Sequence, residues 1–114
     1  MIINTTRITV GPENRKELFQ TIEPLLDPIR REKGCLAYRF YVDATDENSS
    51  LLIGEWETKA DWTNHLRSRD CAVLLGAIAV LSSPAGIDFK LLSGIADMEA
   101  IARTGPVAVA NFRR

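Results

Sequence analysis

The chain has 114 residues, of which 46% are hydrophobic and 25% are charged, and its formal net charge is −1. These values are typical of one globular domain with a single core, and they exclude the dense positive charge that nucleic-acid binding requires. The longest apolar run, Cys71 to Leu81, is shorter than the ~20 residues that cross a bilayer, and the N-terminal segment has no signal-peptide pattern. We therefore expect a cytoplasmic protein that binds neither nucleic acid nor membrane.

Cysteine and histidine are scarce. The two cysteines, Cys35 and Cys71, and the single histidine, His65, cannot supply the four ligands of a structural zinc site. We expect free thiols and no bound metal.

The first element is predicted to be a strand over residues 2–10, because its apolar residues alternate. Ile2, Ile8 and Val10 share one face of this strand, and the same face carries Asn4 and Thr6. Two polar side chains are therefore expected on an otherwise apolar inner face.

A helix is predicted to follow, opened by Gly11-Pro12, since proline is tolerated in the first turn. Its apolar stripe has helical spacing and consists of Leu18, Ile22, Leu25, Leu26 and Ile29. Pro24 and Pro28 each lack a backbone N–H. We expect the helix to kink or break near Pro24 and to end at Gly34.

A hairpin of two strands comes next. In CLAYRFYVD the residues Leu36, Tyr38, Phe40 and Val42 alternate with a second face. ATDENSS is a polar turn, and LLIGEWET, which begins at Leu51, is the second strand.

Two more helices and a last strand complete the pattern. Thr58 and Asp61 have the spacing of a capping box, which predicts a helix from Lys59. Residues 71–81 are apolar nearly all round and are expected to form a buried helix. SSPAG then ends that helix, and IDFKLLSG alternates as the final strand.

The resulting order, β-α-β-β-α-β with a split second helical region, predicts an α+β sandwich: one antiparallel sheet with helices on one face. Tyr41, Leu51, Ile53 and Leu92 are expected on or near the other face. A bare apolar sheet face usually marks an interface. We therefore predict a homodimer in which two sheets pack face to face.

The chain is divided into a domain over residues 1–95 and a C-terminal tail over residues 96–114. In that tail, PVAVANF is suited to adding a strand to an edge of the partner. A tail without fixed structure is the alternative.

Two stretches, KGCLAYRFYVD (33–43) and LLIGEWETKADWTNHLRSRD (51–70), resemble the antibiotic biosynthesis monooxygenase (ABM) family of small dimeric ferredoxin-like proteins. The matching residues are Gly34, Tyr38, Glu55, Trp56, Trp62, His65, Leu66 and Ser68. The resemblance covers about residues 3–93 and implies a ferredoxin-like βαββαβ sandwich. It also implies a relation to oxygenases that oxidise quinols or anthrones without a cofactor.

The family has a haem-degrading branch with Asn in the first strand, Trp on the helix and a haem-ligating His. This chain has Thr6, His65 and Leu75 at the corresponding places. We therefore do not expect haem degradation.

His65 is the candidate catalytic base, because histidine titrates near pH ~6.5. Trp62, His65 and Leu66 share one helix face, which is expected to face the sheet and to bring His65 near Asn4 and Thr6. A few convergent polar groups in an apolar cleft are typical of a small-molecule site. The candidate substrate-binding residues are Asn4, Thr6, Tyr38, Trp56, Trp62 and Leu66.

The predicted function is a cofactor-independent monooxygenase that oxidises a small electron-rich aromatic or quinol with molecular oxygen. Two alternatives stay open: a non-catalytic dimeric ligand-binding or stress-response module, and a cofactor-free isomerase in which His65 transfers a proton. His65 could also be a hydrogen-bonded core residue, and Trp56 and Trp62 could be core aromatics. Glu55 is more easily explained as a strand-face or interface carboxylate than as an acid in the site.

Overall fold

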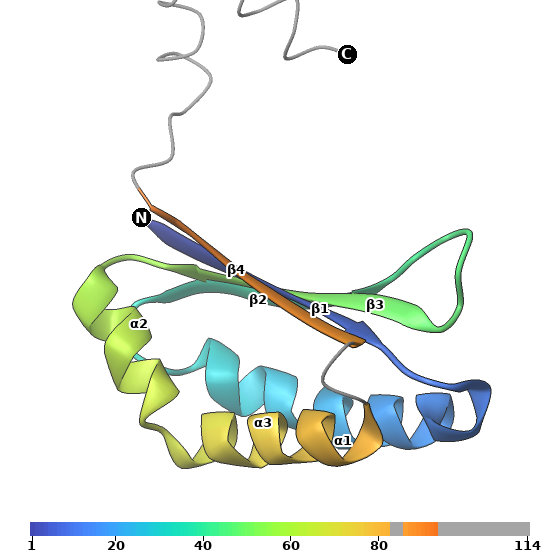
Figure 1. Ribbon diagram of the computed structural model, residues 1–114. Coiled ribbons are helices and arrows are strands. Elements are labelled where there is room, and N and C mark those ends of the chain that lie inside the picture. Colours follow the sequence, from blue (N-terminus) through green and yellow to red (C-terminus); the bar gives the residue numbers. More distant parts are fainter. Residues whose placement is uncertain (83–85, 94–114) are drawn as a thin grey trace, which may run out of the picture.

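The computed structural model describes residues 1–82 and 86–93. Its elements are β1 (Ile2–Thr9), α1 (Pro12–Arg30), β2 (Cys35–Val42), β3 (Ser49–Trp56), α2 (Lys59–Leu66), α3 (Arg69–Leu81) and β4 (Ile87–Ser93). The strands form one antiparallel sheet in the order β2-β3-β1-β4, and the helices cover one of its faces (Figure 1). The predicted ferredoxin-like α+β sandwich is confirmed, whereas the predicted tail lies outside the described residues.

The central strand β1 has the predicted alternation. Ile2, Asn4, Thr6 and Ile8 are buried toward the helices, and the residues between them are more exposed. The sheet thus presents two polar side chains to the core from its middle.

Helix α1 does not break near Pro24, which was one of the two outcomes expected there. It runs without a break from Pro12 to Arg30, with Pro24 and Pro28 inside it. Its stripe still packs inward, because Leu18, Ile22 and Ile29 are buried. Tertiary packing of that face outweighs the two lost backbone hydrogen bonds.

The helix also ends before Gly34, which instead shapes the turn into β2. Gly34 has φ +79°, and a Cβ there would collide with the carboxylate of Asp61 on α2. Only glycine combines a positive φ with so close an approach.

Strand β2 departs from the predicted alternation at Leu36, which was expected to share a face with Tyr38. A bulge between Cys35 and Ala37 shifts the pairing with β3. Leu36 is 56% exposed as a result, and Cys35 packs against the core in its place. An extra residue in one strand reverses the alternation on one side of the bulge.

The two helices after β3 begin at side-chain caps. The Thr58 hydroxyl accepts from the Asp61 N–H at 3.1 Å, so the predicted cap and the start at Lys59 are confirmed. The Ser68 hydroxyl accepts from the Cys71 N–H at 3.1 Å and opens α3. The chain therefore turns sharply between Leu66 and Arg69.

Helix α3 is buried on one side only, contrary to the prediction that it is buried all round. Cys71, Leu74, Ile78 and Leu81 face the core. Val80 is 83% exposed, and Val73 and Leu75 are about half exposed. With a sheet on one side only, a fold of this size has no second layer to cover the outer face.

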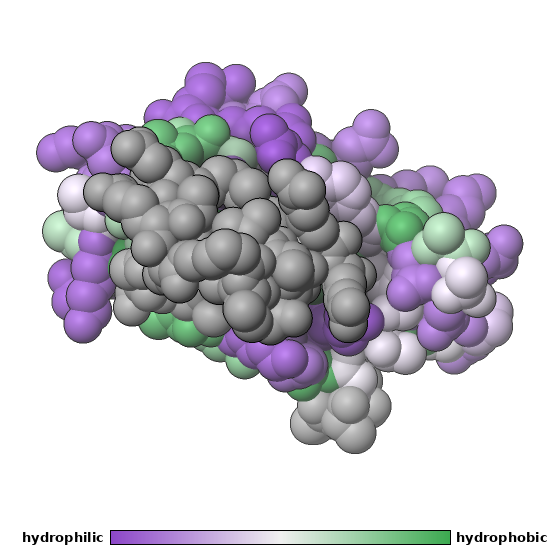
Figure 2. Space-filling view, turned by 90° about the horizontal axis from the view of Figure 1, so that it is seen from above, coloured by the Kyte–Doolittle hydropathy of each residue, from purple (hydrophilic) through white to green (hydrophobic). Residues whose placement is uncertain are grey.

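The face of the sheet opposite the helices carries the residues predicted for it. Leu51 pairs with Arg7 and Tyr41, and Ile53 pairs with Thr5, so these side chains alternate with the buried set. The side chain of Leu92 lies outside the described residues. Seen from this side, the rim of the molecule shows both hydrophilic and hydrophobic residues (Figure 2).

Among the described residues, no helix is both long and apolar enough to cross a membrane.

Candidate functional site

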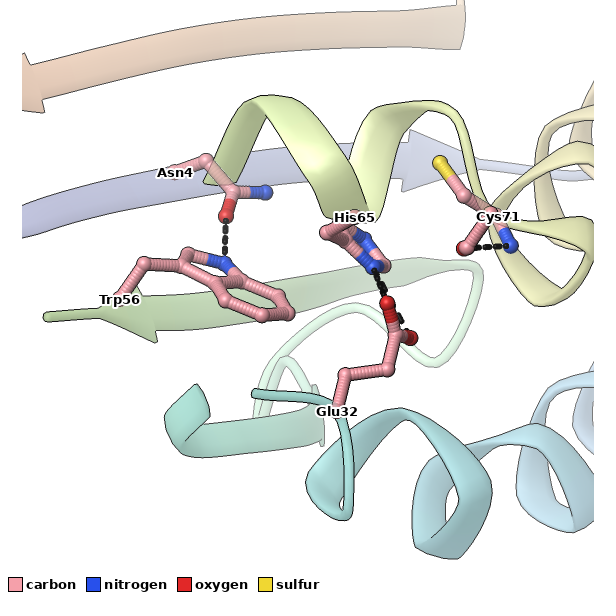
Figure 3. A network of polar contacts seen from close by, with 6 residues as sticks. Asn4, Glu32, Trp56, His65 and Cys71 are labelled. Carbon is pink, nitrogen blue, oxygen red and sulfur yellow. Dashed lines mark hydrogen bonds and ion pairs between the residues drawn. The ribbon is translucent and has the colours of Figure 1, made fainter. Parts of the chain in front are cut away.

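His65 lies between α2 and the sheet and is 3% exposed. Its Nδ1 is 3.1 Å from both carboxylate oxygens of Glu32, a residue of the turn after α1 (Figure 3). Because a carboxylate only accepts, Nδ1 carries the hydrogen and donates it. The neutral imidazole then has its free lone pair on Nε2, which is the arrangement a general base needs.

Two aromatic rings hold the imidazole in place. Trp56, at the end of β3, stacks on His65 with a centroid separation of 4.5 Å and an interplanar angle of 25°. Tyr38 of β2 lies at 5.6 Å from the imidazole in a tilted arrangement. His65 is therefore held by the Glu32 carboxylate at Nδ1 and by two aromatic rings.

Asn4 joins this group through Trp56. The indole N–H of Trp56 donates to Asn4 Oδ1 at 3.1 Å, and both residues are buried (Figure 3). Gly54 makes the contact possible: a Cβ there would collide with Asn4 Oδ1 and would lie 2.9 Å from Trp56 Nε1. Thr6 is buried on the same face of β1, two residues after Asn4.

Tyr38 is held in its neutral form. Burial, followed by smaller contributions from Cys71 and Glu32, raises the pKa of its phenol well above the ordinary value. A neutral phenol can donate a hydrogen bond, so Tyr38 is suited to orienting an oxygen rather than to removing a proton.

Cys71 approaches this region because the helix breaks after Leu66. Burial, and then the charge of Glu32, raise the pKa of its thiol. A protonated thiol is a poor nucleophile, and among the described side chains no hydrogen bond joins it to His65. The site therefore has no Cys-His pair of the kind that nucleophilic catalysis uses.

Leu66 does not lie as predicted, whereas Trp62 faces the core but is only partly buried. The buried face of α2 runs through Asp61 and His65, and Leu66 is 41% exposed. Trp62 is half-buried against the core, and within the described residues its indole N–H is buried without a hydrogen-bond partner. Their contact with a substrate stays a prediction.

Glu32 is the residue that sequence reasoning missed. It lies in the charged stretch RREKG, which reads as exposed surface, yet its side chain is only 20% exposed. The available signal was indirect: a lone inward histidine needs a partner for its second nitrogen. No group of three potential metal ligands occurs among residues 1–82 and 86–93.

The surface hollows of the described part of the chain lie elsewhere. We compared five of these hollows, and His65 does not line any of the five. One of about 320 Å³ lies beside Arg30 and the start of β2. The predicted polar cluster is thus present, but the open cleft expected beside it is not among these hollows.

Residues 1–74 match the family model described as antibiotic biosynthesis monooxygenase. The chain belongs to this family. The ABM match covers well over half of the chain and includes β1, β2, β3, α2 and the start of α3, so it contains the whole Asn4–Trp56–His65–Glu32 cluster.

Solved structures share the ABM fold. A crystal structure of an antibiotic biosynthesis monooxygenase is similar with a TM-score of 0.75 and 22% identity, over 84% of this chain and 100% of that one. Rv0793 from Mycobacterium tuberculosis is similar with a TM-score of 0.77 and 18% identity, over 85% of this chain and 97% of that one. SnoaB from Streptomyces nogalater, a cofactor-independent oxygenase, is similar with a TM-score of 0.72 and 15% identity, over 85% of this chain and 95% of that one.

A curated relative, the uncharacterized protein sll1783 of Synechocystis, is 31% identical over 67 residues. This stretch is 59% of the present chain and 46% of that protein, so the chain spans about half the length of this relative.

Proposed function

We propose that this ABM protein is a cofactor-independent monooxygenase that oxidises a small electron-rich aromatic or quinol with molecular oxygen. The observation that carries the proposal is the buried His65, whose Nδ1 is bound by Glu32 and whose ring stacks on Trp56. Membership of the ABM family and the similarity to the SnoaB fold support it.

The first step is removal of a proton by Nε2 of His65. For an anthrone, a proton of the CH₂ group opposite the carbonyl in the central ring moves to Nε2, and the electron pair is delocalised through the rings onto the carbonyl oxygen as an enolate. The imidazolium that forms is stabilised by the Glu32 carboxylate, 3.1 Å from the other nitrogen. Glu32 therefore favours the charged state that the step creates.

The second step uses that anion. It passes one electron to O₂, and the carbon radical and superoxide combine as a peroxide anion. This anion takes the proton back from Nε2 of His65, and loss of water from the hydroperoxide leaves a new carbonyl. One oxygen atom ends in the product and the other in water, and all four electrons come from the substrate. No metal or flavin takes part in this scheme.

Proton removal sets the energetic requirement. A phenol with a pKa near ~10 lies ~3.5 units above a free imidazole, which makes the transfer uphill by roughly 5 kcal/mol. Hydrogen bonds to the substrate oxygen must reduce that cost. The neutral phenol of Tyr38 and the amide N–H₂ of Asn4 are the candidate donors. The amide N–H₂ remains available because only the Asn4 oxygen is bound by Trp56.

The test is oxygen consumption with menadiol or an anthrone in air. We expect a rate above the spontaneous one, with ¹⁸O from ¹⁸O₂ in the anthrone product. His65→Gln should lower the enzymatic rate by roughly 10²–10⁴-fold, the usual contribution of a positioned base. Glu32→Gln should lower it less, because the amide still accepts from Nδ1–H but no longer stabilises the imidazolium.

Glu17→Gln is the matched control, since it makes the same substitution at an exposed carboxylate of α1 that has no contact with His65. It should leave the rate unchanged. Rates equal to the spontaneous one for the wild type across several quinols and anthrones would contradict the monooxygenase proposal.

One observation favours a second candidate, a non-catalytic ligand-binding module: His65 lines none of the hollows described above. This candidate predicts ligand binding without turnover, which calorimetry with the same quinols would detect. Turnover without O₂ would instead indicate an isomerase.

The proposed assembly is a homodimer through the open face of the sheet. Leu51, Ile53 and Tyr41 lie on that face, and Tyr41 is 47% exposed. Arg7 and Arg39 lie beside Leu51 and Ile53, so the face is mixed, and an exposed apolar patch within such a face is commonly an interface.

A further inference from the structure

The surface hollow beside the start of β2 is lined by two arginines. It has a volume of about 320 Å³, and its lining consists of Arg30, Arg39 and the first residues of the strand, Cys35 to Tyr38. This volume lies within the range of roughly 300–1,000 Å³ that small-molecule sites have. His65 does not line the hollow, so a ligand bound there would occupy a place separate from the site proposed above.

Arg30 is fixed at the wall of this hollow by two hydrogen bonds. Its Nε donates to the Tyr38 carbonyl at 2.8 Å, and its Nη1 donates to Asp27 Oδ1 at 3.1 Å. A guanidinium carries further N–H groups beyond these two, and the side chain is still 44% exposed. Because Arg30 is held by both β2 and α1, its orientation is set before a ligand arrives, which reduces the entropic cost of binding.

Arg39 supplies a second positive charge. Its side chain is exposed, and it forms no ion pair with another residue in the ranges 1–82 and 86–93. Glu55 of β3 is paired with Ala37 in the sheet, but no ion pair joins it to Arg39. Asp27 offsets the charge of Arg30 only, so the hollow keeps an excess of one positive charge.

The backbone of β2 adds a hydrogen-bond donor to the same wall. β2 is an edge strand, and in an antiparallel ladder every second residue bonds to the neighbouring strand. The Asp43 N–H donates to Ser49 O at 2.9 Å, which by this alternation turns the backbone of Arg39 toward β3 and that of Tyr38 toward the free edge. The bond from Arg30 to the Tyr38 carbonyl agrees with this orientation. The Tyr38 N–H therefore points out of the sheet, and it has no acceptor within the described part of the chain.

The rest of the lining is mostly apolar. The bulge in β2 leaves Leu36 56% exposed, and Leu36 and Ala37 both line the hollow. A ligand with a short hydrocarbon body next to its charged group would contact these two side chains. The hollow thus combines an anion-binding wall with a small apolar surface.

The thiol of Cys35 does not compete for the arginines. Burial, and after it the charge of Glu32, raise the pKa of this thiol, while Arg30 has a smaller lowering effect. A protonated thiol carries no negative charge, so it leaves the positive charge of the hollow available to a ligand. It also places a chemically reactive group on the wall, where a bound ligand would shield it.

A carboxylate matches this arrangement of donors. It is planar and singly charged, and its two oxygens accept parallel hydrogen bonds from a guanidinium. A phosphate group carries a charge of about −1.5 to −2 at neutral pH, which exceeds the single positive charge that Asp27 leaves uncompensated. The charge balance therefore favours a carboxylate over a phosphate.

We propose that the hollow at the free edge of β2 binds the carboxylate group of a small organic acid, which accepts hydrogen bonds from Arg30, Arg39 and the Tyr38 N–H.

An NMR titration of the full chain with butanoate tests this proposal. We expect a saturable shift of the Tyr38 amide resonance with a dissociation constant on the order of 1 mM, and no shift with the neutral isostere butanamide. Arg39→Gln should weaken butanoate binding by roughly tenfold, the equivalent of one lost hydrogen bond between charged groups. Arg31→Gln is the matched control, because Arg31 is an exposed neighbour of Arg30 that does not line the hollow, and it should leave the affinity unchanged.

Alkylation of Cys35 by iodoacetamide gives a second readout. Cys35 lines the hollow, whereas Cys71 is only 2% exposed and serves as the unreactive reference. Saturating butanoate should slow the modification of Cys35 in the wild type, and the same concentration should slow it much less in Arg39→Gln.

Three results would overturn the proposal: equal responses to butanoate and butanamide, an affinity that Arg39→Gln leaves unchanged, or tighter binding of inorganic phosphate than of butanoate. Both measurements use the protein in its solution assembly. A second subunit that covered the hollow would therefore appear as an absence of binding, which would equally overturn it.

Discussion

At the scale of single residues, Gly54 controls how closely Asn4 and Trp56 approach each other. It is the residue of β3 paired directly with Asn4, and its missing side chain leaves the space in which the indole N–H reaches the amide oxygen. Tyr38 closes the same space, with its ring 3.0 Å from where a Cβ would lie. The absence of one methyl group therefore permits the contact that orients Trp56 under His65.

We predict that Gly54→Ala destabilises the protein by roughly 1–3 kcal/mol, the usual effect of overpacking a well-packed core. The methyl group displaces Asn4 or Trp56 and breaks their hydrogen bond. Urea unfolding followed by tryptophan fluorescence measures both the lost stability and the changed indole environment.

Gly76→Ala is the control for this change. A Cβ at Gly76 meets no atom within 4 Å, and alanine in a helix interior is favoured over glycine by roughly 0.5–1 kcal/mol. The two alanines should therefore shift stability in opposite directions, and a stabilising Gly54→Ala would refute the close approach.

At the scale of elements, α2 is short and depends on its cap. The Thr58 hydroxyl accepts from the Asp61 N–H and donates to the Asp61 carboxylate at 2.9 Å. That carboxylate is buried against Gly34. The cap therefore fixes both the start of α2 and the contact that holds the turn carrying Glu32.

We predict that Thr58→Ala costs about 0.5–2 kcal/mol, the range for removing a capping hydroxyl. It should also loosen the His65–Glu32 contact, which ¹⁵N chemical shifts of the imidazole report through the tautomer. Thr63→Ala, which removes only a bond back to Lys59 O, should leave both measurements unchanged. If the His65 tautomer is unchanged in Thr58→Ala, the cap does not contribute to the His65–Glu32 contact.

Elements and their order could be predicted from the sequence because they depend on local signals. The alternation of β1 and the capping box before α2 are examples, and both are found in the structure. The bulge at Leu36 and the unbroken path of α1 through Pro24 could not be predicted. Both depend on packing between elements, which overrides local propensity.

The candidate site shows the same division. His65 was expected near Asn4 and Thr6 because strand and helix periodicity place all three on inner faces, and Asn4 does join His65 through Trp56. Glu32 was missed because a turn residue has no periodicity, and its position depends on how α1 ends relative to α2. Leu66 was misplaced because the helix buries Asp61 and His65 instead of its more apolar neighbours.

At the scale of the whole molecule, the one-sided sheet determines the assembly we propose. Helices cover one face (Figure 1), and Ile53 lies in the middle of the other, paired with Thr5 and Arg39. We predict that the wild type has about twice the 12.7 kDa mass of the chain in light scattering, and that Ile53→Glu is a monomer. The new carboxylate can pair with Arg39 within one subunit, so the fold should survive. In a face-to-face dimer both copies of this carboxylate would be taken out of water, and removing a charged group from water costs several kcal/mol even when it is paired.

Val80→Glu is the matched control, because Val80 is the most exposed of the large apolar residues on α3. It adds the same charge to the opposite side of the molecule and should leave the dimer intact. Dissociation by Val80→Glu rather than by Ile53→Glu would place the interface on the outer face of α3. That surface is also apolar, because the segment from Cys71 to Leu81 contains no charged residue. The two variants therefore decide which of the two apolar faces the second subunit covers.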